Sequence, residues 1–234
     1  AGYMDNTTGT AKDGYIITNT QKTTRFTVNK KWFPHLSEPV TEIKVNIVEK
    51  EDGFIRQITL KKSEGWTKTL TDLPEYNSHG RKAEYRAEEV AVPGYKPELD
   101  TMVGQTTLYN IKLIDIPVKK VWLAANKQEI EVVLLANGTP VQNEFLNAGN
   151  NWEHTFKNLP TYQKGQDGQY HPITYKVQEV TLAGYQSKIT QKNNADITKG
   201  VIITNTELIE IPVKKVWQSS KPKQTVEVEL HYAD

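Results

Sequence analysis

Short segments in which apolar and polar residues alternate run through most of the chain. Residues 43–48 (IKVNIV) and 130–135 (IEVVLL) are rich in β-branched side chains, and this composition with a period of two predicts β-strands. The dipeptides Asp52-Gly53 and Asn137-Gly138 follow soon after these segments, and both are typical of tight hairpin turns. No window keeps the 3.6-residue period of a long amphipathic helix. Strands separated by turns every 8–12 residues or so predict an all-β, antiparallel sandwich.

The motifs along the chain repeat. Trp32, Trp122 and Trp217 are separated by 90 and 95 positions, and other motifs recur with a similar offset. These are Leu73-Pro74 with Leu159-Pro160, residues 85–90 with 175–180, Gly94-Tyr95 with Gly184-Tyr185, and residues 15–20 with 201–206. A repeat of this length with strand signals throughout predicts tandem β-sandwich units arranged end to end.

The phase of the repeat predicts where the units begin and end. Complete units are expected over residues 23–114 and 115–209. Residues 1–22 are expected to carry the closing strand of a preceding unit, and residues 210–234 the opening strands of a following one. We therefore interpret the sequence as part of a longer array, with any export signal or wall anchor outside it. The linkers have no Gly-, Pro- or Ser-rich run, so neighbouring units are expected to form a rod with restricted motion.

Each opening strand carries a lysine in register with apolar residues. Residues 116–122 and 211–217 are identical (IPVKKVW), and residues 26–32 are a looser copy. Read with a period of two, they place Lys30, Lys120 and Lys215 on the face that should enter the core. Burying an ammonium group without a partner is costly. The sequence must therefore provide something for these lysines to interact with.

Two further polar side chains recur on apolar faces. One is a glutamate, at Glu89 and Glu179, and the other is an asparagine. The asparagine positions are Asn19, Asn110 and Asn205. The residues alone leave two interpretations open, of which the first is an ordinary buried salt bridge with an amide beside it.

The second interpretation is covalent. Apolar surroundings lower the pKa of a lysine, so its neutral amine becomes available as a nucleophile. A carboxyl group in the same pocket can polarise the asparagine carbonyl and relay protons. Attack on the side-chain amide would expel ammonia and leave a neutral amide cross-link.

An ordered set of motifs connects the chain to a known family. The segments VKKVW, LLANG, NW…LPxY, YxVxE, GY and ITNT, taken in that order, resemble the CnaB family, the B-type repeats of Gram-positive surface adhesins and pilins, over essentially the whole chain. The resemblance implies an inverse immunoglobulin-like sandwich in each unit. It also implies a self-formed isopeptide bond between lysine and asparagine on the first and last strands, assisted by the glutamate.

By position, the implied bonds are Lys30–Asn110 with Glu89 and Lys120–Asn205 with Glu179. The first unit departs from the family at Tyr109, where a threonine is usual, and Lys31 is a rival nucleophile there that the alternation argues against. Asn19 and Lys215 each lack a partner within their own partial unit. Their segments are expected either to fray or to dock on a neighbouring molecule.

Composition argues against several other functions. The 29 basic and 28 acidic residues nearly cancel and form no basic run, which argues against nucleic-acid and membrane-surface partners. Cysteine is absent, so disulfides, thiolate catalysis and cysteine metal sites are excluded. The five histidines do not recur at metal-ligand spacings, and residues 5–9 lack the later ligands of a calcium loop. No metal or cofactor is expected.

We therefore expect a structural stalk of a cell-wall-anchored bacterial adhesin, located outside the cell. Its partners would be neighbouring repeats of the same chain, with host matrix contacted, if at all, through other domains. The recurring tryptophans are expected to pack in cores and not to bind carbohydrate. The alternative is an adhesin domain that binds host matrix directly, which would need a surface found in only one unit. Beyond a bond that forms once per unit, no enzyme activity is expected.

Overall fold

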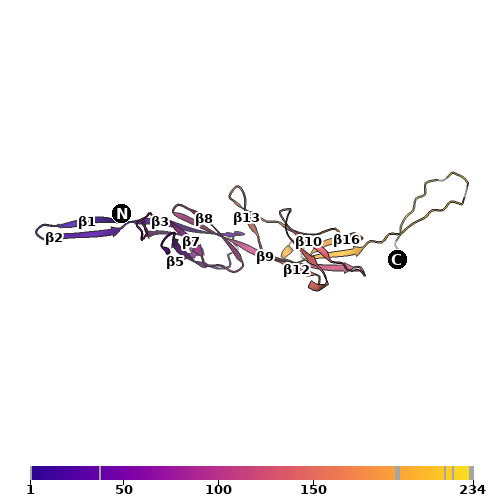
Figure 1. Cartoon of the computed structure of the whole chain (residues 1–234), viewed down its shortest axis with the longest axis horizontal. Coiled ribbons are helices and arrows are strands. Elements are labelled where there is room, and N and C mark those ends of the chain that lie inside the picture. Colours follow the sequence, from indigo (N-terminus) through magenta and orange to yellow (C-terminus); the bar gives the residue numbers. More distant parts are fainter. Residues whose placement is uncertain (1, 37, 193–195, 219, 223, 232–234) are drawn as a thin grey trace.

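The computed structural model describes residues 2–36, 38–192, 196–218, 220–222 and 224–231. A hairpin, two β-sandwich units and a terminal segment follow one another along its long axis (Figure 1). In the described residues the units consist of strands and short turns, with 3-10 helices of three residues between some of them. None of the helices described is long and apolar enough to cross a bilayer. The predicted all-β class and tandem arrangement are confirmed.

The first unit contains two sheets that face each other across a core. One sheet has the order β5-β4-β7, and in the other β3 lies between β6 and β9, with β8 on the far side of β9. The elements are β3 (Thr23–Phe33), β4 (Glu42–Glu49), β5 (Gly53–Lys61), η1 (Lys62–Glu64), β6 (Thr67–Pro74), β7 (Tyr85–Glu89), β8 (Tyr95–Met102) and β9 (Gln105–Leu123).

The second unit repeats this arrangement. Its smaller sheet has the order β11-β10-β15, and its larger sheet places β9 between β12 and β17, with β16 beyond β17. A separate hairpin, β13–β14, has no counterpart of regular strands in the first unit. The elements are β10 (Ile130–Ala136), β11 (Thr139–Leu146), η2 (Ala148–Asn150), β12 (Glu153–Pro160), β13 (Tyr162–Lys164), β14 (Tyr170–Pro172), β15 (Tyr175–Glu179), β16 (Tyr185–Gln191), η3 (Ile197–Lys199) and β17 (Val201–Glu207).

Alternation of apolar and polar residues builds both cores. On β3 every second residue from Phe26 to Trp32 is buried, and on β4 the same holds from Ile43 to Ile47. Because successive side chains of a strand point to opposite faces, the apolar set of each strand enters the space between the sheets. The two cores are separate clusters, one drawn from β3 to β9 and the other from β9 to β17. Each unit therefore has a hydrophobic core of its own.

β9 belongs to both units. Its first half closes the first unit beside β3, and its second half opens the second unit beside β17. Between the halves, Lys112 pairs with β8 and Leu113 with β12, so the linker is itself a paired strand. A strand of 19 residues spans roughly 60 Å. The division proposed between residues 114 and 115 falls inside this strand, and its position stays a prediction.

The opening and closing strands have the same register in both units. β3 runs parallel to β9, with Trp32 opposite Asn110. β9 runs parallel to β17, with Trp122 opposite Asn205. Since each lysine lies two residues before its tryptophan, lysine and asparagine come near the same end of two adjacent strands.

The N-terminal segment holds one strand more than the sequence pattern predicted. β1 (Tyr3–Thr10) and β2 (Gly14–Gln21) form an antiparallel hairpin, with Asp5 opposite Asn19. The register matches β8–β9 and β16–β17, where Pro97 and Ser187 lie opposite Asn110 and Asn205. Residues 2–22 thus correspond to the last two strands of a unit, and not to its closing strand alone. β1 was missed because its threonine-rich sequence has no apolar alternation.

The prediction of opening strands over residues 210–234 is not met in the described residues of that segment. Residues 208–218, 220–222 and 224–231 are assigned to no strand, and Figure 1 shows this part as an extended loop. A strand is held by hydrogen bonds to neighbours. Residues 211–217 pair with no strand in the described part of the chain, whereas residues 116–122, which have the same sequence, pair with both β12 and β17.

Candidate functional site

Lys30 lies inside the first unit. Its side chain is 0% exposed, and its ammonium nitrogen lies 4.8 Å from the centre of the Trp32 ring. Lys31, the next residue on β3, is exposed and reaches over Tyr109 on the outer face. The two lysines therefore differ in surroundings, and only Lys30 shares the core with Glu89 and Asn110.

Glu89 joins the two sheets of the first unit. It ends β7 in the smaller sheet, and its carboxyl group reaches the strands β3 and β9 of the larger sheet. Lys30 Nζ donates a hydrogen bond of 2.6 Å to Glu89 Oε2, and Asn110 Nδ2 donates one of 2.8 Å to Glu89 Oε1. The glutamate side chain is only 3% exposed. One buried carboxyl group thus binds both the amine and the amide.

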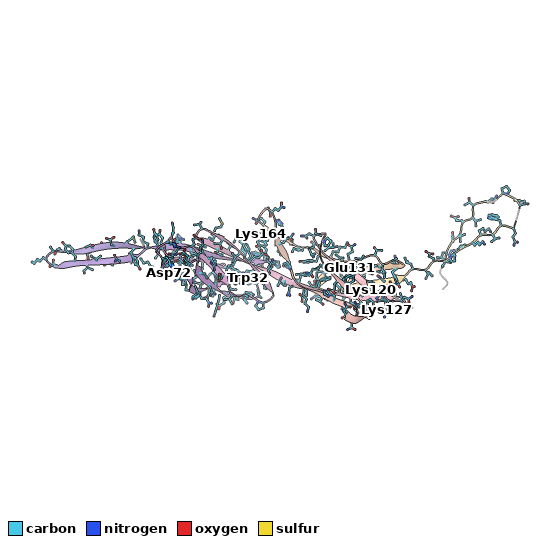
Figure 2. All side chains as sticks on the ribbon, viewed as in Figure 1. Trp32, Asp72, Lys120, Lys127, Glu131 and Lys164 are labelled. Atoms are coloured by element: carbon cyan, nitrogen blue, oxygen red, sulfur yellow. The ribbon has the colours of Figure 1, made fainter. Side chains whose placement is uncertain are left out.

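The second unit brings the equivalent residues together. Lys120 Nζ lies 3.4 Å from Glu179 Oε2, and Asn205 Nδ2 donates a hydrogen bond of 2.5 Å to Glu179 Oε1. The side chains of Lys120 and Glu179 are 0% and 2% exposed. Figure 2 shows Lys120 within the body of this unit. A further donor, Ser187 Oγ, lies 2.6 Å from Glu179 Oε2.

Ser187 was not among the residues predicted from the sequence. It is in phase with Tyr185 on β16, so alternation alone could have placed it on the inward face. The comparison of repeats hid it, because the first unit has Pro97 at the same position opposite the asparagine.

Burial changes the acid–base properties of both lysines. Removal from water lowers the pKa of Lys30 to about 8, although the Glu89 carboxylate acts in the opposite direction. The pKa of Lys120 is lowered for the same reason, against the opposing charge of Glu179. A lowered pKa makes the neutral amine, which is the nucleophilic form, easier to reach at moderate pH.

Aromatic rings close both sites against water. The Trp32 ring lies 5.4 Å from Trp66 and 5.2 Å from Tyr95 between ring centres. In the second unit Trp122 lies 5.5 Å from Trp152 and 5.3 Å from Tyr185. These four tryptophans pack against the cores, as expected from their recurrence, whereas Trp217 is exposed. Water exclusion strengthens the electrostatic interactions inside each site.

Asn19 and Lys215 are not brought to such a site. Asn19 lies on the exposed hairpin β1–β2, and Lys215 is exposed in the segment that forms no strand. Lys215 Nζ does lie 4.9 Å from the centre of the Trp217 ring, which repeats the local lysine–tryptophan contact of the two units. Within the described residues, no group of three or more His, Asp or Glu side chains is placed to hold a metal ion.

The lowered pKa of Lys30 predicts a pH-dependent stability once the side-chain amide of Asn110 is removed. In Asn110→Ala the unfolded lysine keeps its proton up to about pH 10.5, whereas folded Lys30 releases it near pH 8. The unfolded chain then binds more protons between these values, so the free energy of unfolding rises with pH in this window. We expect a gain of up to about 3 kcal/mol, measured by urea unfolding.

The reference for this measurement carries Lys30→Met and Glu89→Gln in addition to Asn110→Ala. It lacks the titrating pair, so its stability should not show the gain. If both proteins follow the same pH profile from pH 8 to 10.5, the assigned shift of Lys30 is wrong.

Comparison with known proteins identifies the family. The model of the Cna protein B-type domain matches residues 26–111 and 116–206. A collagen adhesin of Staphylococcus aureus is 30% identical over 209 residues, which are 82% of this chain and 18% of that protein. The chain thus spans less than a fifth of this relative.

Solved structures from surface proteins are also similar. Two B repeat units of the collagen binding protein of Staphylococcus aureus are 25% identical, covering 88% of this chain and 56% of that one with a TM-score of 0.35. The pilus backbone of Streptococcus pneumoniae is 19% identical over 47% of this chain and 29% of that one, with a TM-score of 0.31. The two segments that match the family model contain both lysine–glutamate–asparagine sites. The chain belongs to the Cna protein B-type domain family.

Proposed function

We propose that this chain is a stalk segment of a bacterial cell-surface adhesin, located outside the cell, in which each unit is closed by a Lys–Asn isopeptide bond. The bonds are Lys30–Asn110 and Lys120–Asn205. The observation that supports this most strongly is the buried carboxyl group that contacts both amine and amide in each unit. Each bond forms once, so the chain turns over no substrate.

The reaction proposed for the first unit needs only the three side chains. The Lys30 ammonium transfers a proton to Glu89 Oε2, and the resulting amine attacks Asn110 Cγ. Glu89 then passes protons between the attacking nitrogen and the amide. The Cγ–Nδ2 bond breaks, ammonia leaves, and the new bond joins Nζ to Cγ. Glu89 keeps one proton, so the site ends neutral and the cost of a buried ion pair disappears.

The two bonds would give the chain a short covalent path for force. Pulling force would enter along β3, pass from Lys30 to Asn110, and follow β9 directly to Lys120. From there it would pass to Asn205 on β17. The remaining strands of each unit lie outside this path. Since β9 is one strand from Gln105 to Leu123, no flexible loop interrupts the path between the units.

Aromatic packing supports a stiff joint between the units. The hairpin β13–β14 of the second unit places Tyr170 with its ring 4.7 Å from Phe33 and 4.7 Å from Tyr109 of the first. Tyr162 lies 5.1 Å from Phe33. This contact accounts for tyrosine at position 109, where the second unit has Thr204. Tyr109 packs in the joint, while the next residue enters the site.

Polar contacts also join the hairpin β13–β14 to β8 of the first unit. Lys164 Nζ lies 2.7 Å from both carboxylate oxygens of Asp100 on β8, and Tyr170 donates a hydrogen bond of 2.6 Å to Glu98. Figure 2 shows Lys164 on the arm that stands between the two units. The corresponding loop of the first unit forms no hairpin of regular strands and contains one isolated antiparallel β-bridge, between Tyr76 and Lys82. The joint is therefore held by a paired strand and by a hairpin that reaches across it.

Removal of the hairpin contacts is expected to loosen the joint without unfolding the units. In the variant Lys164→Ala, Tyr170→Ala both cross-unit polar contacts and the central ring are lost. The residual dipolar couplings of the variant should then require a separate alignment tensor for each unit. In the parent, one alignment tensor should fit the couplings of both units. Lys164 is exposed and Tyr170 is half-buried in the joint, outside both cores. The free energy of unfolding should therefore fall by about 1–3 kcal/mol, from the lost ring pairs and hydrogen bond, and both units should stay folded.

The matched control for the joint is Tyr15→Ala, which removes an exposed tyrosine far from it. This variant should behave as the parent. If the hairpin variant keeps a single alignment as well, β9 alone holds the joint and the hairpin has no part in its stiffness.

The bonds can be identified by proteolysis and tandem mass spectrometry. The proposal predicts one branched peptide that joins Lys30 to Asn110 and another that joins Lys120 to Asn205. A branch at Lys31 would contradict the proposed nucleophile. Linear peptides that contain unmodified Lys30 and Asn110 as the main products would contradict the bond itself.

A further inference from the structure

The two sites differ at one strand position that faces the asparagine. In the second unit Ser187 lies opposite Asn205, and in the first unit Pro97 lies opposite Asn110. Ser187 Oγ donates a hydrogen bond of 2.6 Å to Glu179 Oε2. A proline side chain has no hydrogen to donate. The second site therefore holds a fourth polar group that the first site lacks.

The Ser187 hydroxyl group and the Lys120 ammonium group contact the same carboxylate oxygen, Glu179 Oε2. Lys120 Nζ lies 3.4 Å from Glu179 Oε2, whereas Lys30 Nζ lies 2.6 Å from Glu89 Oε2. Ser187 is exposed at the surface, while the glutamate side chain is 2% exposed. The hydroxyl group thus reaches the buried carboxyl group from the solvent side and is closer to its oxygen than the amine is.

Oε2 is also the atom that must accept the lysine proton before the amine can attack. A hydrogen bond to the ionised form of a carboxyl group favours that form. The Ser187 hydroxyl lies closer to Oε2 than Lys120 Nζ does, so it competes with the lysine for the oxygen that takes the proton. The first unit shows that the arrangement of lysine, acid and amide is complete without such a donor.

We propose that Ser187 is a positioning residue that slows isopeptide formation in the second unit relative to the first. This inference rests on the proposed function. The reaction itself is unchanged: one proton passes from Lys120 to Glu179, Nζ bonds to Cγ of Asn205, and ammonia leaves. Ser187 acts only through the carboxyl group and neither gains nor loses a proton.

The test follows bond formation in newly made protein. The full chain is synthesised in a cell-free system, stopped with acid at successive times, and digested so that each unit's loss of ammonia is measured separately. Ser187→Ala should raise the rate in the second unit about fivefold, the factor expected for one hydrogen bond. Ser187→Thr keeps the hydroxyl group and should stay slow. Pro97→Ser should slow the first unit and leave the second unchanged.

The outcomes separate this inference from the proposed function. If both units lose ammonia but Ser187→Ala is unchanged or slower, the role of Ser187 is refuted while the bonds stand. If Ser187→Thr is as fast as Ser187→Ala, packing and not the hydroxyl group sets the rate, and the inference is also refuted. If neither unit of the parent loses ammonia, the proposed function fails and this inference fails with it. Circular dichroism of Ser187→Ala establishes that the rates compare folded proteins.

Discussion

Glu89→Ala is expected to leave the first unit without its cross-link and to lower its free energy of unfolding by about 4–5 kcal/mol. This magnitude follows from the loop of roughly 80 residues that the Lys30–Asn110 bond would close. The variant also leaves the buried Lys30 without its partner, which adds to the loss. Calorimetry should show the transition of one unit moved to lower temperature. The intact mass should fall short of the mass expected from the variant's own sequence by one ammonia fewer than in the parent.

Glu88→Ala is the matched control for this prediction. Glu88 is the preceding residue on β7, but its side chain is 46% exposed and pairs with Arg86 at the surface. Its removal should leave the mass loss unchanged and alter the stability by about 0.5 kcal/mol or less. If Glu89→Ala and the parent each fall short of the mass of their own sequence by the same number of ammonia molecules, Glu89 is not needed for the bond.

The second large effect is mechanical. When the parent chain is pulled from its ends, the residues between Lys30 and Asn110 and those between Lys120 and Asn205 should not be released. The double variant Glu89→Ala, Glu179→Ala should instead unfold in two steps, each releasing roughly 280 Å of chain. The difference arises because the bonds would carry force from β3 to β9 and from β9 to β17 without loading the other strands. Single-molecule force spectroscopy measures these lengths directly.

The double variant Glu88→Ala, Gln178→Ala serves as the control for pulling. Both residues precede the proposed catalytic glutamates and face outward, so these chains should extend like the parent. Release of either length from the parent would contradict the proposed force path, because a closed unit cannot extend in this way.

Much of the site could be predicted from alternation along single strands. A period of two places Lys30 with Val28 and Trp32, and the same rule places Lys120 with Val118; both lysines are buried with these neighbours. The meeting of lysine, glutamate and asparagine depends on how β3 pairs with β9 and on how the sheet that holds β7 packs against them. The sequence suggested that pairing only through the repeat and the family resemblance.

What could not be predicted depends on differences between the repeats or on contacts between units. Ser187 was hidden because Pro97 stands at the same place in the first unit. The contact between Lys164 and Asp100 joins residues of two units, so no pattern within one unit indicates it. Sequence alone also did not separate residues 211–217, which form no strand, from residues 116–122, which have the same sequence and form part of β9 between β12 and β17.

The intact mass of the purified chain tests the central claim most directly. Two isopeptide bonds predict a mass lower than that of the 234-residue sequence by two molecules of ammonia, with one loss assigned to each unit. The full mass of the unmodified sequence would contradict the account. Lys30 and Lys120 would then be held only by ion pairs with Glu89 and Glu179, and no side-chain cross-link would join β3 to β9 or β9 to β17.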